Sequence, residues 1–274
     1  MHRRFAQVDV FSEESLGGNP VAVVLDADGL STEAMQRLAR WTNLSETTFV
    51  LPAQSPDADY QTRIFTPTVE LPFAGHPTLG TCHAWLEQTG ADGDRFVQQC
   101  GAGLVEIRRS EGRLMFAAPQ LLRSGPVAEE LLDHLVAMLG ITRQDVVDAQ
   151  WVDNGPGWVA VLLSDAAAVL DLRPGIVDLD IGVAGFRPPG EPEALEVRAF
   201  FPKDGATVED PVTGSLNASL AEWLIRTGRL SAPYVARQGT ALGRTGRAFV
   251  STDDHGRVWV GGATRTVVTG HVEF

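Results

Sequence analysis

The amino-acid sequence predicts an α+β protein made of two similar halves. Three observations predict this class: short motifs recur in one order about 135 to 138 residues apart, the expected strands outnumber the expected helices, and each half holds one helix rich in alanine, leucine and tryptophan. These offsets bracket half of the 274-residue chain. The length therefore fits one unit that was copied once.

The repeat rests on three pairs of segments. The pattern R-x-F-x-P occurs at 63–67 and again at 198–202, and W-L-x-x-T-G occurs at 85–90 and 223–228. Upstream of each, the apolar segment 19–26 resembles 157–164. Strand and helix-end sequences can coincide by chance, but several matches in the same order favour a duplication.

The first half is expected to begin with a β-branched strand between turns and a helix capped by Ser31. Met35, Leu38 and Ala39 recur at helical spacing in that helix, which runs to about Trp41. The first strand is Val21–Leu25. After the helix we expect strands at Thr47–Leu51 and Gln61–Phe65, a helix at Pro77–Gln88 closed by Gly90, and a hairpin of Leu104–Arg108 with Arg113–Ala117.

The second half is expected to repeat this unit, as a curved, mostly antiparallel or mixed sheet around a central helix. Its predicted elements are an amphipathic helix at Val127–Leu139, strands near Trp158–Leu163, Glu196–Phe201, Ala248–Ser251 and Val258–Val260, and a helix at Ser215–Arg226. Pro119 and Gly125-Pro126 interrupt the pattern between the halves. We predict halves at 1–118 and 119–264, and leave open whether the final strand, 265–274, joins the first half.

The composition limits the classes of function. The formal net charge of −13 repels phosphates and anionic lipids, so we expect neither nucleic acid nor membrane partners. The apolar runs have the length of strands, and the N-terminus turns polar too early for a signal peptide, so we expect a cytoplasmic location. Lys203 is the only lysine available for Schiff-base chemistry, and Cys82 and Cys100 are expected to be reduced packing residues.

Common cofactor and metal motifs are missing from the sequence. It contains no P-loop and no G-x-S-x-G elbow. Gly155–Ala160 matches a loose G-x-G-x-x-A, but a strand follows it where a dinucleotide site needs a helix. His76, His83 and Glu87 share rough helical spacing, which is weak evidence for a metal site. We expect no cofactor and no metal.

Two helix starts are candidate anion sites. Gly75–Thr78 and Asp210–Ser215 each contain a proline, which suits the first position of a helix. Free backbone N–H groups and the helix dipole attract anions at such ends, and in a duplicated fold the two ends can face each other across a cleft and hold a substrate carboxylate.

Each candidate residue also has a structural interpretation. Asp210 can be a helix N-cap, Ser215 can cap a later turn, and His76 can be an ordinary loop residue. Glu46, at the entry to a strand, can be a solvated carboxylate. Its image in the second half, 181–184, contains no acid, so Glu46 would act from one half only.

Six segments in order resemble the phenazine-biosynthesis isomerase family, the PhzF-like proteins. These segments are Gln7–Phe11, Gly18–Pro20, Leu44–Val50, Arg63–Pro67, Phe73–Thr78 and Glu209–Ser215. The resemblance implies a diaminopimelate-epimerase-like fold, with two pseudo-symmetric halves, an active site between them and a homodimer. It agrees with the duplication, which was found independently.

The resemblance also implies roles for individual residues. Glu46 would be the proton-transfer base, with His76, Asp210 and Ser215 in the pocket and the backbone of Gly75 and Gly214 near the substrate. We expect Asp210 and His76 to be catalytic as well and to handle the protons on substrate heteroatoms. Related epimerases use one cysteine from each half, but Gly75 and Asp210 stand at those positions here. We therefore expect a cofactor-independent isomerase that moves a proton and a double bond within a small carboxylated, dihydroanthranilate-like substrate. The alternatives are a non-catalytic carboxylate-binding protein and an amino-acid epimerase or racemase.

Overall fold

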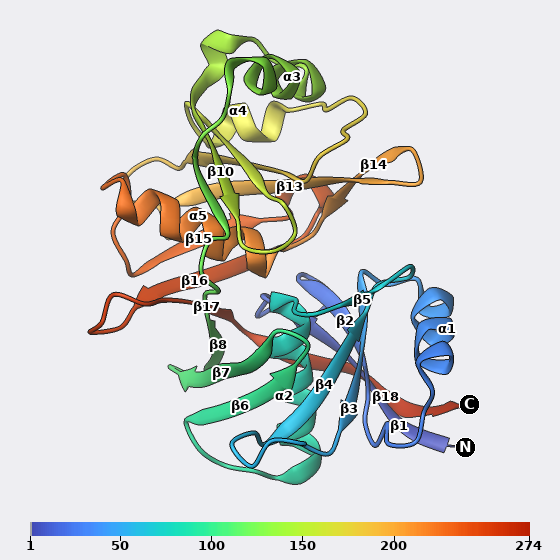
Figure 1. Cartoon of the computed structure of the whole chain (residues 1–274). Coiled ribbons are helices and arrows are strands. Elements are labelled where there is room, and N and C mark those ends of the chain that lie inside the picture. The colour runs from blue at the N-terminus through green and yellow to red at the C-terminus, as the bar shows by residue number, and fades with distance from the viewer. Residues whose placement is uncertain (1) are drawn as a thin grey trace. The chain divides into compact units, whose positions relative to one another are not determined.

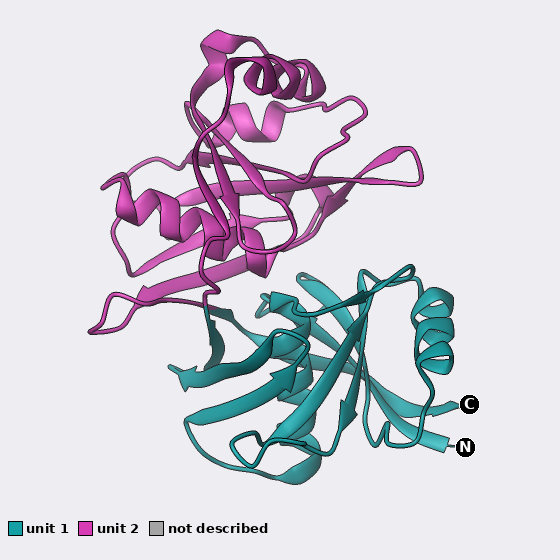
Figure 2. Ribbon diagram, viewed as in Figure 1, with its two compact units in different colours: residues 1–117, 261–274 teal, residues 118–260 magenta. Residues whose placement is uncertain are grey.

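The computed structural model describes residues 2–274, which form two compact units. Of the described residues, unit 1 comprises those up to Ala117 together with 261–274, and unit 2 comprises 118–260, as coloured in Figure 2. The final strand therefore belongs to unit 1. Among the described residues, no helix has the length and apolar character needed to cross a membrane.

Unit 1 contains a mixed sheet and two helices (Figure 1). Ser31 caps the first helix, because its side chain accepts a hydrogen bond from the N–H of Ala34. The elements are β1 (His2–Val10), β2 (Asn19–Val24), α1 (Thr32–Thr42), β3 (Glu46–Leu51), β4 (Tyr60–Phe65), β5 (Glu70–Leu71), α2 (Gly75–Thr89), β6 (Arg95–Cys100), β7 (Gly103–Ser110), β8 (Arg113–Ala117) and the C-terminal β18 (Thr264–Glu273).

Unit 2 repeats this order with one additional helix near its start. Its elements are β9 (Arg123–Pro126), α3 (Glu129–Leu139), a 3-10 turn (Arg143–Asp145), β10 (Val146–Asp153), β11 (Val159–Leu163), α4 (Ala166–Asp171), β12 (Ile181–Phe186), β13 (Leu195–Lys203), β14 (Ala206–Asp210), α5 (Gly214–Arg226), β15 (Tyr234–Gln238), a 3-10 turn (Thr240–Leu242), β16 (Gly246–Thr252) and β17 (Val258–Gly262).

Strand pairing confirms the internal duplication. In unit 1, β1–β2 and β3–β4 are antiparallel, whereas β2–β3 and β4–β6 are parallel. Unit 2 repeats this with antiparallel β10–β11 and β12–β13 and parallel β11–β12 and β13–β15. The register matches too, since Val21 pairs with Glu46 and Val159 pairs with Ile181. An outer strand completes each sheet, β18 against β1 and β9 against β10.

The repeated R-x-F-x-P motif has the same structural role in both units. The Arg63 guanidinium lies over the Phe65 ring and binds the Glu70 carboxylate at 2.6 Å. In unit 2, Arg198 lies over Phe200 and binds Glu209 at 2.7 Å. In both hairpins the phenylalanine is the residue that pairs with the glutamate across the strands. The motif therefore fixes a strand and the hairpin that leads to the central helix.

The central helices α2 and α5 are the most buried helices of their units. Residues on several sides of each helix are inaccessible to solvent, in contrast to the one-sided burial of α1. In unit 1, α2 packs against β1, β2, β3, β8 and β18, and in unit 2, α5 packs against β10 and β16. The predicted α+β class with a helix surrounded by a mixed sheet is confirmed.

The structure corrects the predicted helix starts. Pro77 is the third residue of α2, because the helix begins at Gly75. Pro211 lies outside α5, which begins at Gly214, so Asp210 is the last residue of β14 and is not the N-cap. Pro77 had been expected at the first helical position, and the helix predicted at Ser215–Arg226 begins one residue earlier, at Gly214. In unit 2, strand β14 ends at Asp210, and residues 211–213 connect it to α5.

Gly80 allows α2 to approach the sheet closely. A Cβ atom built there would lie 2.3 Å from Cγ1 of Val21 and 3.1 Å from Cγ2 of Val10, both buried. We expect Gly80→Ala to lower the free energy of unfolding by about 1–2 kcal/mol, because overpacking outweighs the better helix propensity of alanine. Gly270→Ala on β18, where no atom lies within 4 Å of the new Cβ, is the control and should be neutral. Urea denaturation measures both, and equal stabilities would contradict the packing argument.

Candidate active site

Two buried polar residues of unit 1 and the partly buried Glu46 lie together at the starts of their elements. Asn19 is the first residue of β2, Glu46 is the first residue of β3, and His76 is the second residue of α2. The parallel register of β2 and β3 places the two strand starts side by side. The structure thus brings together Glu46, His76 and Gly75, which the sequence predicted, and adds Asn19, which had been quoted in a motif without a role.

Both ring nitrogens of His76 have polar neighbours. The amide nitrogen of Asn19 lies 3.3 Å from Nδ1 of His76, and Nε2 of His76 lies 3.3 Å from Oε2 of Glu46. The Glu46 side chain keeps 15% of its surface exposed.

Burial keeps His76 neutral. Loss of hydration lowers the pKa of the His76 imidazole from 6.5 to about 3, and a hydrogen bond with the backbone of Pro20 opposes this shift only in part. The 3.3 Å contact with Glu46 is therefore one between a neutral ring and a carboxyl group, and it is not an ion pair at pH 7. His76 can donate a proton into a hydrogen bond but is a poor base.

The loop before Asn19 is held by a buried carboxylate. Both carboxylate oxygens of Asp9 lie 3.1 Å from the N–H of Gly18. A Cβ atom on Gly18 would approach the carbonyl oxygen of Val10 to 2.1 Å, so this position requires glycine. Asp9 and Gly18 therefore set where Asn19 enters β2.

The start of α2 presents backbone donors. Its N-cap residue, Ala74, makes no side-chain capping bond, and the first helical hydrogen bond is from the N–H of Thr78 to the Ala74 carbonyl. Pro77 has no N–H. The amides of Gly75 and His76 are thus the donors at this end, beside the Glu46 carboxylate that contacts His76.

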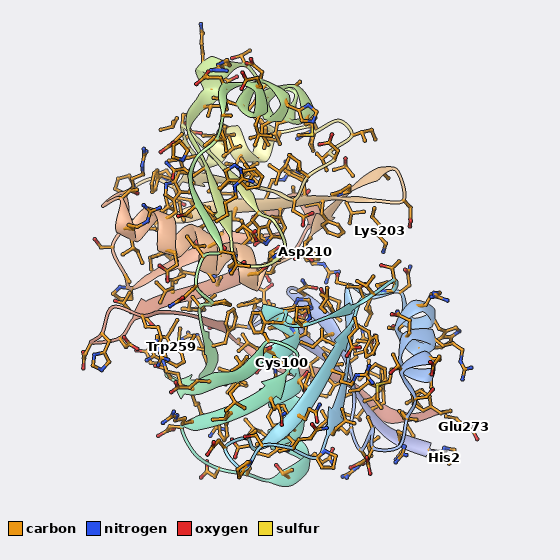
Figure 3. The ribbon with its side chains drawn as sticks, viewed as in Figure 1. His2, Cys100, Lys203, Asp210, Trp259 and Glu273 are labelled. Atoms are coloured by element: carbon orange, nitrogen blue, oxygen red, sulfur yellow. The ribbon has the colours of Figure 1, made fainter. Side chains whose placement is uncertain are left out.

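Unit 2 forms a second polar cluster at the start of α5. Asp210 ends β14 (labelled in Figure 3), and its Oδ2 accepts a 2.5 Å hydrogen bond from the hydroxyl of Thr213. Gln238, at the end of β15, bonds to Thr213 and Asn217, and both of these are also buried. The sequence predicted Asp210, but Thr213, Asn217 and Gln238 carried no signal of a role.

Ser215 and Gly214 also belong to this second cluster. Gly214 is the first residue of α5, whose N-cap Thr213 makes no side-chain capping bond. The Ser215 hydroxyl accepts a 3.0 Å hydrogen bond from Nε1 of Trp158, and its carbonyl accepts one from the Asn154 amide. Because the indole N–H only donates, the hydroxyl hydrogen of Ser215 remains to be donated.

The two clusters occupy equivalent positions in their units but differ in chemistry. Ser215 is the second residue of α5, as His76 is of α2. Ile181 has the register position of Glu46, so unit 2 lacks an acid at that point, as the sequence indicated. Among residues 2–274, no group of three or more histidine, cysteine, aspartate or glutamate side chains is arranged to hold a metal ion.

Comparison with known proteins first gives the class of protein. Solved structures of PhzF-family proteins and of epimerases share the architecture, which is the predicted diaminopimelate-epimerase-like fold. The family described as "Phenazine biosynthesis-like protein" matches residues 8–270. The chain belongs to this PhzC/PhzF family.

Relatives over the full length agree with this assignment. The chain is 38% identical to trans-2,3-dihydro-3-hydroxyanthranilate isomerase of Pseudomonas aeruginosa, over 93% of this chain and 92% of that protein. It is 35% identical to antisense-enhancing sequence 1 of Schizosaccharomyces pombe, over 97% of each. A PhzF-family structure from Enterococcus faecalis aligns over 100% of both chains with a TM-score of 0.80 and 26% identity. The family and these names identify the chain as an isomerase, as predicted.

The buried neutral imidazole has a measurable consequence for stability. Because the folded-state pKa of His76, about 3, lies below the unfolded value of 6.5, the unfolded chain binds an extra proton between these values. Stability is therefore lost as pH falls below 6.5, by about 2 kcal/mol between pH 7 and pH 5 at 1.4 kcal/mol per unit. We expect His76→Gln to remove this part of the acid sensitivity in urea denaturation.

His255→Gln, at an exposed turn, is the control and should keep the wild-type dependence on pH. If the His76 variant loses as much stability as the wild type between pH 7 and pH 5, His76 is not buried in its neutral form.

Proposed function

We propose that the chain is a cofactor-independent isomerase that moves a proton, and with it a double bond, within a small carboxylated substrate. The observation that carries the proposal is the 3.3 Å contact of the Glu46 carboxyl group with Nε2 of a neutral, buried His76. Glu46 is the general base, and the dihydroanthranilate-like substrate class follows from the name of the Pseudomonas relative. The homodimer and the cytoplasmic location stay predictions.

The proposed reaction conserves all atoms of the substrate. Glu46 removes a proton from a carbon next to a π-system, the electron pair of that C–H bond shifts the double bond, and the carboxylic acid returns the proton to another carbon. The imidazole of His76 and the amides at the start of α2 stabilise the negative charge that develops. Positioned proton transfer of this kind contributes on the order of 10²–10⁴-fold.

We assign Asp210 and Ser215 to the protons on substrate heteroatoms. Asp210 is buried, yet it accepts the Thr213 hydroxyl as a carboxylate does, and the Ser215 hydroxyl retains a proton to donate. The backbone N–H groups of Gly75 and Gly214 are the proposed contacts of the substrate carboxylate.

The cysteines argue against a thiol-based epimerase. Burial raises the pKa of the Cys82 thiol to about 12, and burial also raises the pKa of Cys100. Both cysteines lie in unit 1, in α2 and at the end of β6 (Cys100 is labelled in Figure 3). A pair of thiolates with one member in each unit is therefore not available.

The test of the proposed base is Glu46→Gln. With trans-2,3-dihydro-3-hydroxyanthranilate as the probe in D₂O, the wild type should place deuterium at the carbon that receives the proton, as read by NMR. The variant should keep its fold by circular dichroism and lose turnover by 10²-fold or more, since the amide cannot accept the proton.

Glu130→Gln, an exposed carboxylate of α3, is the matched control and should retain full activity. An active Glu46→Gln variant would remove Glu46 from the mechanism. A wild type that binds the probe without isomerisation or exchange would favour a carboxylate-binding protein instead.

A further inference from the structure

The amide of Gln238 uses all of its hydrogen-bonding capacity inside unit 2. Its Nε2 donates to the Asp210 carbonyl at 3.2 Å and to Oγ1 of Thr213 at 2.9 Å. Its Oε1 accepts from the Thr213 N–H at 3.0 Å and from Nδ2 of Asn217 at 2.8 Å. Gln238 is fully buried, so these bonds have no competition from solvent.

The direction of these bonds determines the direction of the next one. Because Nε2 of Gln238 can only donate, Oγ1 of Thr213 accepts there, and its single proton is left for another partner. That partner is Oδ2 of Asp210, 2.5 Å away. A carboxyl oxygen that accepts at this distance is favoured in its ionised form.

We propose that Thr213 and Gln238 are positioning residues that hold Asp210 as an ionised hydrogen-bond acceptor. Thr213 acts directly on the carboxylate, and Gln238 acts through Thr213 by fixing its hydroxyl. The inference rests on the proposed function only where it gives Asp210 a part in turnover. In that reaction the ionised Asp210 carboxylate accepts a proton from a substrate heteroatom and does not supply one.

Two other charged residues lie close to Asp210 along the chain or in the fold. Glu209 precedes Asp210 on β14, so its side chain points to the opposite face, where it binds Arg198. Arg244 packs beside Gly239, which approaches the carbonyl of Pro211. The Thr213 hydroxyl differs from both because it is a neutral group that donates directly to the Asp210 carboxyl.

The test follows the Asp210 carboxyl itself. In protein labelled with ¹³C at aspartate Cγ, the Asp210 signal is identified by its loss in Asp210→Asn, and its titration midpoint is measured by NMR. Thr213→Val, which keeps the side-chain shape and removes the hydroxyl, should move the midpoint upward by about one pH unit, because the ionised form loses a hydrogen bond. Thr213→Ser should restore the wild-type midpoint.

A second variant, at Gln238, tests the role of that residue. It also tests the inference if Thr213→Val does not fold. Gln238→Met leaves the Thr213 hydroxyl free to rotate, so the midpoint should rise by less than in Thr213→Val. Gln98→Met is the matched control, because Gln98 is equally buried in unit 1 and bonds to Thr78 of α2 at 3.0 Å. It should leave the Asp210 midpoint unchanged.

Activity on the probe separates the two proposals. If the midpoint does not rise in Thr213→Val, or Thr213→Ser fails to restore it, the positioning inference is overturned whatever the activity. If the midpoint rises as expected but Asp210→Asn keeps full turnover, Thr213 does position the carboxylate and the proposed role of Asp210 fails. If both proposals hold, the pH below which the turnover rate falls shifts by the same amount as the titration midpoint of Asp210.

Discussion

The burial of one helix against its own mixed sheet is the constraint on which each unit depends. In unit 1, Gly80 of α2 brings the helix axis close to β1 and β2, where Val10 and Val21 leave no room for a side chain at that position. In unit 2 the glycine is on the sheet, since a Cβ at Gly182 would lie 2.3 Å from Cδ1 of Leu216 in α5. In both units the close packing places the start of the central helix beside the starts of the neighbouring strands. Polar side chains at these starts therefore lie next to one another and are shielded from solvent.

The same scaffold carries different chemistry in the two units. A residue at the entry to the second strand contacts the second residue of the central helix in both: Asn19 contacts His76, and Trp158 contacts Ser215. The strand beside it begins with Glu46 in unit 1 and with Ile181 in unit 2. Duplication therefore supplied two equivalent positions, and the proposed base, Glu46, occupies only one of them. This asymmetry suits a reaction in which one carboxylate takes a proton and also returns it.

The duplication was predictable because R-x-F-x-P encodes a contact within a hairpin, which leaves a mark on local sequence. The matching strand β12 was missed, although it is the counterpart of β3. Gly182 and Gly185 weaken its strand pattern, but the fold requires them, since a Cβ at Gly185 would lie 2.2 Å from the carbonyl oxygen of Asp165. The helix starts were misplaced because proline restricts the backbone at several positions of a first turn, and sequence alone does not select one.

A side-chain amide contacts the central residue of each cluster, and local sequence carries no signal of it. The Asn19 amide nitrogen lies 3.3 Å from Nδ1 of His76, and the Gln238 amide leaves the Thr213 proton for Asp210. Gln238 lies 28 residues beyond Asp210, on a strand that follows the whole of α5. Such partners become visible only when the chain is folded. A buried carboxyl group that accepts a hydrogen bond from a hydroxyl of fixed orientation is favoured in its ionised form, so the proposed role of Asp210 fits a chain whose net charge is −13.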